Sequence, residues 1–267
     1  MKLFYRKYGN GPPLFILHGL FGSSDNWVTF ARKISDLYTV YLPDLRNHGL
    51  SPHSEVHDYN SMRDDLHELI TELKIGKFFL AGHSMGGKIA AAYSLEWPSM
   101  LNGLLIADIS PFVNGKYLYE TYRHYLKILN AVIACDLTQN LSRAAIESHI
   151  ASAITDEKER GLILKNLHRT AGNSFEWKIN AIALHKNLER IMEMIDRSKY
   201  SDSQVTGFPV LFLKGENSDY LPEDDYRDIR KTYPGADFYT IPGAGHWVQA
   251  DRPDEVAECF RMMINEC

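Results

Sequence analysis

The chain has 267 residues, of which 45% are hydrophobic and 24% are charged, and its formal net charge is −5. This length and apolar content are enough for one main domain with an insertion. No basic stripe of the kind that nucleic acids bind occurs along the sequence, so the charge pattern argues against a nucleic-acid partner.

The three cysteines, Cys135, Cys259 and Cys267, are widely spaced and form no C-x-x-C pair. This pattern is typical of reduced thiols rather than of zinc ligands or a redox dithiol. The first residues contain no apolar stretch followed by a small-residue cleavage site, and no apolar run approaches the roughly 20 residues of a membrane span. We therefore expect a cytoplasmic protein without a membrane span.

Over residues 1–110, short apolar runs alternate with longer stretches in which apolar residues recur at helical spacing. The apolar runs are residues 14–17, 38–42, 78–81 and 104–107, and the helical stretches are residues 27–37, 61–73 and 88–97. Alternation of buried strands with helices is typical of βαβ units. The first part of the chain is therefore predicted to form a parallel sheet.

The pattern changes at residue 112, and up to residue 205 it contains amphipathic helices and no convincing strand. Four helices are expected there, at residues 119–129, 141–154, 156–168 (with Thr155 as N-cap) and 177–195. Strands return at residues 209–213 and 238–241, with helices at 223–231 and 253–265. This order predicts an α/β core domain made of residues 1–111 and 206–267, with a helical cap of residues 112–205 inserted into it.

A Gly-His-Ser-Met-Gly motif at residues 82–86 lies between the apolar run 78–81 and the helical stretch that begins near Lys88. In this context G-x-S-x-G places Ser84 on a sharp strand-to-helix turn, where glycines avoid collisions with neighbouring backbone. The turn exposes the Ser84 hydroxyl and aims the N–H of Met85 at the charge that develops on an attacked carbonyl. Ser84 is therefore predicted to be a nucleophile rather than a serine that only caps a helix.

Two further turns carry groups that such a serine needs. His18-Gly19-Leu20 follows the first apolar run, and an H-G-x turn there usually supplies the second oxyanion N–H, which we assign to Leu20. His18 itself is predicted to be packed and hydrogen-bonded rather than catalytic. After the last predicted strand, the small residues at 243–245 leave room for His246 to lie over the nucleophile, so His246 is the predicted general base.

The acid that orients the histidine has two candidates. Asp108 ends the apolar run 104–107 and thus lies at the carboxyl edge of a strand, where open α/β sheets collect functional groups. The commoner position, three residues after Gly215, is occupied by Ser218, and Asp219 comes one residue late. We therefore expect Asp108 to be the acid; the alternatives are that Asp219 takes this role and that Asp108 only caps a turn.

His48, His53 and His57 lie in one segment with Asp44 and Asp58, and these are residue types that bind metal ions. His53 and His57 are four residues apart, but Pro52 and the lack of apolar periodicity indicate a loop, and Ser54 stands where H-E-x-x-H requires Glu. We interpret this segment as a solvated loop without zinc.

Five blocks, at residues 18–27, 44–51, 82–88, 108–111 and 243–247, resemble the α/β-hydrolase superfamily and within it the YbfF-like esterases and thioesterases. The resemblance implies an eight-stranded, mostly parallel sheet and no metal or organic cofactor. It also implies a small-molecule substrate, a short to medium acyl ester or acyl-CoA thioester, cleaved through an acyl-enzyme intermediate. Caps diverge freely and set the substrate, so substrate contacts are expected from motif neighbours and cap aromatic residues, namely Phe21, Trp247, Tyr119, Tyr122 and Trp177. The alternative for the three cap residues is the cap's own core.

Two rival functions remain open. C–C bond hydrolases and lyase-like relatives use the same three residue types but usually need arginines in the cap, where Arg123, Arg143 and Arg169 are available. A non-catalytic ligand-binding receptor or scaffold would have no use for an intact serine turn and histidine turn. Labelling of Ser84 by a fluorophosphonate probe would separate an enzyme from a scaffold.

Overall fold

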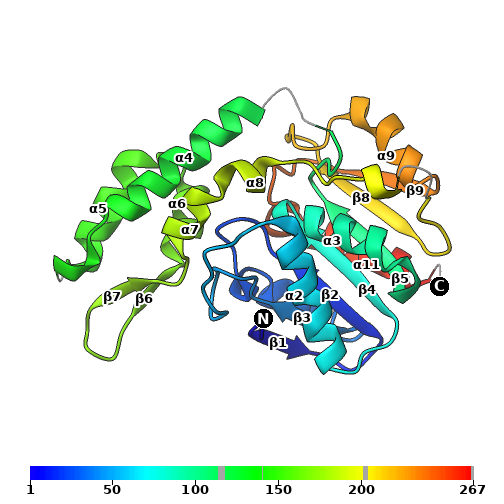
Figure 1. The fold of residues 1–267 in the computed structure, drawn as a ribbon, viewed down its shortest axis with the longest axis horizontal. Coiled ribbons are helices and arrows are strands. Elements are labelled where there is room, and N and C mark those ends of the chain that lie inside the picture. Colours follow the sequence, from blue (N-terminus) through cyan, green and yellow to red (C-terminus); the bar gives the residue numbers. More distant parts are fainter. Residues whose placement is uncertain (114–117, 140, 201–203, 266–267) are drawn as a thin grey trace.

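The computed structural model describes residues 1–113, 118–139, 141–200 and 204–265. Within these residues the main sheet has seven strands in the order β1-β3-β2-β4-β5-β8-β9 (Figure 1). They are β1 (Tyr5–Tyr8), β2 (Pro13–Leu17), β3 (Thr39–Pro43), β4 (Phe78–His83), β5 (Leu101–Ala107), β8 (Val210–Gly215) and β9 (Ala236–Ile241). All neighbours are parallel except β1, which is antiparallel to β3. The predicted mostly parallel sheet is confirmed, but the described residues form seven strands in it instead of the expected eight.

Helices cover both faces of this sheet because its central strands are apolar on both faces. They are α1 (Val28–Lys33), α2 (Tyr59–Glu72), α3 (Met85–Glu96), α9 (Tyr226–Thr232), α10 (Val248–Asp251) and α11 (Pro253–Asn265). Phe78 packs in a buried cluster with residues of α2 and α3, whereas Phe79 packs in a second cluster with residues of α1 and α11. Successive residues of one strand thus fill opposite sides, as the strand period of two requires.

The segment between β5 and β8 extends to one side of the sheet (green in Figure 1). It contains α4 (Leu118–Ala134), α5 (Arg143–Ala153), α6 (Glu157–Leu164), β6 (Leu167–Arg169), β7 (Phe175–Trp177), α7 (Ala181–Lys186) and α8 (Leu188–Met192). The expectation of helices alone is wrong, because β6 and β7 form an antiparallel hairpin between the end of the expected helix 156–168 and the start of the expected helix 177–195. The N-cap of α6 is Asp156, whose side chain accepts from the N–H of Glu159, and not Thr155. None of the described helices has the length and apolar character needed to cross a membrane.

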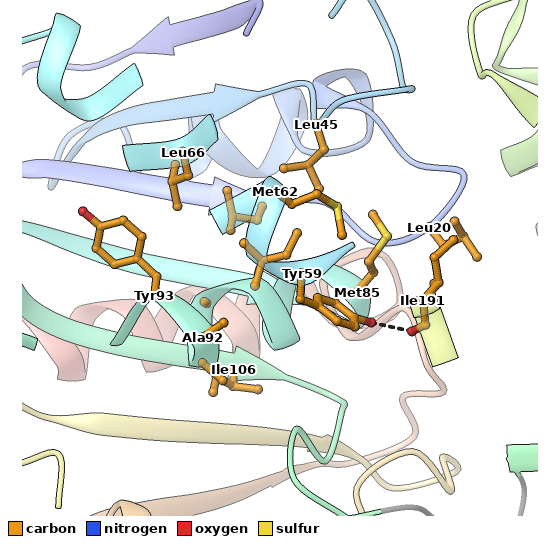
Figure 2. Packing of buried hydrophobic residues seen from close by; sticks show 14 of the residues in the cluster. Leu20, Leu45, Tyr59, Met62, Leu66, Met85, Ala92, Tyr93, Ile106 and Ile191 are labelled. Carbon is orange, nitrogen blue, oxygen red and sulfur yellow. Dashed lines mark hydrogen bonds between the residues drawn. The ribbon is translucent and has the colours of Figure 1, made fainter. Parts of the chain in front are cut away.

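Hydrogen bonds join this segment to the sheet-bearing part of the chain. The Tyr59 hydroxyl donates to the carbonyl of Ile191 over 2.6 Å, inside a buried cluster that includes Leu20 and Met85 (Figure 2). The ammonium group of Lys88 on α3 donates to the carbonyl of Glu193 over 2.8 Å. These contacts hold the end of α8 against α2 and α3.

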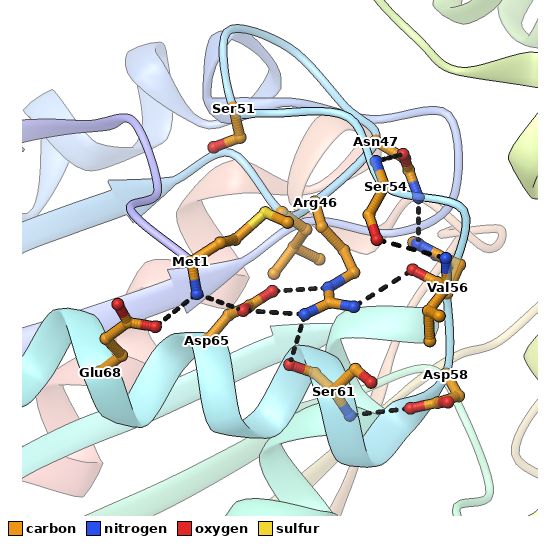
Figure 3. A network of polar contacts seen from close by, with 12 residues as sticks. Met1, Arg46, Asn47, Ser51, Ser54, Val56, Asp58, Ser61, Asp65 and Glu68 are labelled. Atoms are coloured by element: carbon orange, nitrogen blue, oxygen red, sulfur yellow. Dashed lines mark hydrogen bonds and ion pairs between the residues drawn. The ribbon is translucent and has the colours of Figure 1, made fainter.

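A second polar network fixes the loop between β3 and α2 (Figure 3). The guanidinium of Arg46 donates two hydrogen bonds to the carboxylate of Asp65, at 2.6 and 2.9 Å, and both residues are buried. Arg46 also donates to the carbonyls of Val56 and Ser61. The bidentate pair therefore ties the loop to α2.

Candidate active site

Ser84 lies on the turn between β4 and α3, as the motif predicts, with backbone angles φ 54° and ψ −120°. Non-glycine residues rarely adopt a positive φ, and such strain is concentrated at functional sites. The turn needs its glycines: a Cβ on Gly82 would lie 2.1 Å from the carbonyl oxygen of Gly86, and one on Gly86 would lie 2.4 Å from that of Leu17. The close approach of β4, β2 and α3 therefore sets the position of the serine.

Ser84 and His246 line one cavity of about 560 Å³ between the main sheet and the inserted segment. His246 lies in the turn after β9, and this turn is held by the carboxylate of Asp251, which accepts from the N–H of Gly245 over 2.9 Å. The lining also includes apolar side chains, and its volume is in the range of small-molecule sites. The cavity thus brings together the two residues that the sequence proposes as nucleophile and base.

Asp108 follows β5 directly and is fully buried. Its Oδ2 lies 2.7 Å from Nδ1 of His246, and its Oδ1 accepts from the N–H of Gly215 over 2.8 Å. The Ser218 hydroxyl also donates to Oδ2. Like Ser84, Asp108 has a positive φ, of 52°. The carboxylate is thus oriented by hydrogen bonds from β8 and from the loop that follows it.

Asp219, the competing acid, has an exposed side chain. Within the described part of the chain, no hydrogen bond or ion pair joins Asp219 to His246. The residue three positions after Gly215, Ser218, points instead at Asp108. The structure therefore pairs His246 with Asp108 and leaves Asp219 outside the pair.

The two predicted oxyanion donors are available. Met85 is the first residue of α3, where a helix leaves backbone N–H groups without an intrahelical partner. Among the described residues, no hydrogen bond uses the N–H of Met85 or of Leu20. The next N–H after Leu20, that of Phe21, is already bonded to Nε2 of His48 over 3.3 Å. These contacts leave the N–H groups of Leu20 and Met85 free to bind a developing oxyanion.

His18 and His48 support the loop that carries Leu20. Nδ1 of His18 contacts the carbonyl of Gly19 at 2.9 Å, while its Nε2 accepts from the N–H of Leu45 at 3.0 Å. Burial lowers the pKa of His18 to about 4 and that of His48 to about 3. His18 is therefore a packed, hydrogen-bonded residue, as predicted.

The interpretation of residues 48–57 as a solvated loop is wrong for two of its three histidines. His48 and His57 are fully buried, and only His53 is exposed. The loop folds inward because Asn47 bonds both the N–H of Ser54 and the ring of His57. Within residues 1–113, 118–139, 141–200 and 204–265, no three His, Cys, Asp or Glu side chains are grouped so that they could hold a metal ion.

Of the five residues expected to contact substrate, Phe21 and Trp247 line the cavity. The described lining does not include Tyr119, Tyr122 or Trp177. Tyr119 is 67% exposed on the outer side of α4, whereas Tyr122 and Trp177 pack against the buried core. The structure brings the first two residues to Ser84 and leaves the three cap aromatic residues elsewhere.

Sequence reasoning missed Tyr220, which stacks on His246, and Tyr125, which contacts Tyr220. The ring of Tyr220 is stacked on that of His246, with centroids 3.9 Å apart and an interplanar angle of 22°. The hydroxyl of Tyr125, on α4, lies 3.2 Å from that of Tyr220. Tyr220 immediately follows Asp219, so its place in the loop after β8 was the one available signal.

Charged side chains occupy the rim of the cavity. Lys158 of α6 and Asp251 of α10 form an ion pair of 2.6 Å, and His124 of α4 bonds Glu159 at 2.7 Å. This second contact raises the pKa of His124 above its ordinary value. The rim is therefore polar, whereas the lining also includes the apolar side chains of Leu20, Phe21, Trp27 and Trp247.

Comparison with known proteins shows to which family the chain is related. A sequence model described as the Alpha/beta hydrolase family matches residues 14–259. The sn-1-specific diacylglycerol lipase ABHD11 of Danio rerio is 36% identical over 92% of this chain and 76% of that protein. Esterase YbfF of Escherichia coli (strain K12) is 31% identical over 96% of this chain and 94% of its own length. A solved structure named Marine microorganism esterase has a TM-score of 0.89 and 37% identity, covering 98% of this chain and 99% of the other. The chain belongs to the alpha/beta hydrolase family.

Proposed function

We propose that this protein hydrolyses carboxylic esters of short to medium acyl chains by forming an acyl-enzyme on Ser84. The carboxylic ester hydrolase expected from the sequence is supported by relatives named esterase and lipase that match over most of the chain. The observation that carries the residue assignment is geometric. Ser84, strained at φ 54°, shares one cavity with His246, whose Nδ1 lies 2.7 Å from Asp108.

The chemistry divides among these groups as follows. His246 accepts the Ser84 proton while the serine oxygen forms a bond to the carbonyl carbon of the ester. The N–H groups of Leu20 and Met85 stabilise the oxyanion that results. Collapse of this intermediate breaks the bond to the alcohol, which takes the proton from His246. Water then attacks the acyl-enzyme with His246 as base, which releases the acid and restores Ser84.

Asp108 orients His246 and stabilises its protonated form. A buried carboxylate is costly unless it is hydrogen-bonded, and Gly215 and Ser218 supply those bonds. The fixed contact at Nδ1 leaves Nε2 of His246 for the serine proton. A cytoplasmic location remains a prediction from the sequence. Cys135 and Cys259 are free thiols in the structure, and Cys267 lies outside the described residues.

The lining of the cavity supports the proposed substrate class. Its apolar lining residues suit an acyl chain, and its polar rim suits the leaving group, whether an alcohol or the thiol of an acyl thioester. The rival carbon–carbon bond chemistry calls for cap arginines in the site. Arg123, Arg143 and Arg169 are absent from the described lining, so ester hydrolysis is the function that we favour.

The test begins with a fluorophosphonate probe and a series of p-nitrophenyl esters assayed beside acyl-CoAs. We expect the wild type to be labelled and Ser84→Ala to be unlabelled, with ester hydrolysis reduced to near background in a folded protein. Ser152→Ala, an exposed serine of α5 outside the cavity, is the control and should keep full activity. Retention of more than a few per cent of the wild-type rate by Ser84→Ala would remove Ser84 as nucleophile, and an unlabelled wild type would favour a scaffold.

A further inference from the structure

Besides the carboxylate of Asp108, the imidazole of His246 contacts three rings, of which that of Trp247 is the most distant at 6.0 Å. Tyr220 is stacked on the imidazole at 3.9 Å, and the ring of His83 lies 4.6 Å away at an angle of 46°. Nε2 of His83 lies 2.7 Å from the backbone carbonyl of His246, to which it donates. Burial lowers the pKa of His83 to about 3, so His83 is neutral in the working range of an esterase. The one anion in direct contact with His246 is therefore Asp108, among the described residues.

Tyr220 is itself held in place by a residue of the inserted segment. Its hydroxyl lies 3.2 Å from that of Tyr125 on α4, and the Tyr125 ring makes an edge-on contact with Phe21 at 5.8 Å. Phe21 belongs to the loop that carries Leu20. The loop that carries Leu20, helix α4 and the loop after β8 thus each contribute one aromatic residue to a continuous row of contacts. This row ends on the face of the His246 ring.

The face of an aromatic ring attracts a cation that lies within about 6 Å of the ring centroid, and it attracts a neutral ring less strongly. In the proposed mechanism His246 accepts the serine proton and thereby becomes an imidazolium. The stacked Tyr220 ring therefore interacts more strongly with the transition state than with the resting enzyme, which is the condition for an effect on kcat. Burial raises the pKa of Tyr220, so its ring stays an uncharged phenol throughout.

We propose that Tyr220, held by Tyr125, is a positioning residue that keeps the His246 ring in place and stabilises its protonated form during ester hydrolysis. This inference rests on the proposed function for its kinetic consequence. The charged groups that also line the cavity, which any change of pH profile must take into account, are His124, Glu157, Lys158, Glu159, Lys165 and Asp251.

The experiment compares Tyr220→Leu, which removes the ring, with Tyr220→Phe, which keeps the ring and loses the hydroxyl. We expect Tyr220→Leu to lower kcat by about tenfold and to move the midpoint of the pH profile of kcat/KM to lower pH by about half a unit or more. Tyr220→Phe and Tyr125→Phe should stay within about threefold of wild type in kcat. Equal losses in Tyr220→Leu and Tyr220→Phe, or an unchanged midpoint in Tyr220→Leu, would overturn the proposal.

A second measurement separates this proposal from the proposed function. The NMR signal of a ring C–H of His246 is followed as the pH is varied. The signal is assigned by its absence from the spectrum of His246→Gln. This titration requires no catalysis. A lower titration midpoint in Tyr220→Leu supports the stacking role even if the wild type hydrolyses no ester; an unchanged midpoint refutes it. If Tyr220→Leu does not fold, both measurements are made on Tyr220→Met, whose unbranched side chain occupies the same space. The result for Tyr220→Met then supports or refutes the proposal.

Discussion

Oδ2 of Asp108 lies 2.7 Å from Nδ1 of His246, although 138 positions separate the two residues in the chain. The contact exists because β5 and β8 are neighbours in the sheet and the turn after β9 returns over their carboxyl ends. Asp219, which is closer to His246 in sequence, has no such contact among the described residues.

The first prediction tests this pairing with two variants that remove a charge and keep the side-chain shape. Asp108→Asn should lower kcat by about a thousandfold or more, because an amide neither holds the tautomer of His246 nor stabilises its protonated form. Asp219→Asn is the matched control and should stay within about tenfold of wild type. The reverse order of the two losses, measured on one ester under the same conditions, would transfer the role to Asp219.

The second prediction concerns acyl chain length. Leu162 of α6 is half-buried and lines the cavity, whereas Tyr119 of α4 is exposed. Leu162→Ala opens apolar space in the site, so kcat/KM for the longest ester hydrolysed should rise about fivefold or more relative to that for the acetate. Tyr119→Ala should leave this ratio unchanged. If the two variants show the same chain-length profile, the acyl chain does not lie against α6.

The third prediction is a loss of stability in mild acid. Burial lowers the pKa of His18 to about 4 and the pKa values of His48 and His83 to about 3, whereas in the unfolded chain each pKa is near 6.5. Well above pH 6.5 neither state binds these protons, and the full stability is present. As the pH falls below 6.5, only the unfolded state binds them, so the free energy of unfolding decreases until the pH reaches the folded-state values.

Within this pH window, each of these histidines lowers the free energy of unfolding by about 1 kcal/mol for every pH unit of acidification. Urea unfolding between pH 6.5 and pH 5 should therefore show a steep decrease in the free energy of unfolding, and His48→Gln should show a smaller slope than the wild type. Equal slopes in the two proteins would mean that His48 binds its proton equally in the folded and unfolded states.

The fourth prediction concerns the buried pair of Arg46 and Asp65. Asp65→Ala leaves the guanidinium buried without its carboxylate and should lower the free energy of unfolding by about 3 to 5 kcal/mol. The control is Glu147→Ala, which breaks an exposed pair with Arg143 on α5 and should cost less than about 1 kcal/mol. Urea unfolding of both variants measures the difference, and similar values for both would show that the network in Figure 3 adds little.

The sequence predicted the central strands because buried parallel strands are continuous apolar runs, and these runs stand out wherever they occur. It missed β1, an edge strand whose four residues, Tyr-Arg-Lys-Tyr, form neither an apolar run nor an alternating pattern. It also missed the hairpin of β6 and β7, because two three-residue strands give no detectable period. The Gly and Asn between the two strands are residues typical of a turn, and Asn173 has the positive φ, 69°, that such a turn requires.

The site could be predicted to the extent that its residues lie on turns with a local signature. Ser84 and His246 follow strands and are flanked by glycines, and Asp108 ends an apolar run. Tyr125 could not be told from Tyr119 and Tyr122, which share its helix at three-residue spacing. Which of the three faces Tyr220 depends on how α4 packs on distant residues, and this is a property of the tertiary structure.

The topology also has a consequence for synthesis on the ribosome. β5 pairs with β4 on one side and with β8 on the other, but β8 is translated only after the whole segment of residues 112–205. At about 5 to 20 residues per second, the nascent chain exposes the free edge of the apolar strand Leu101–Ala107 for several seconds. An unpaired apolar edge is a template for aggregation, so the yield of active protein should respond to chaperones and to translation speed within this segment.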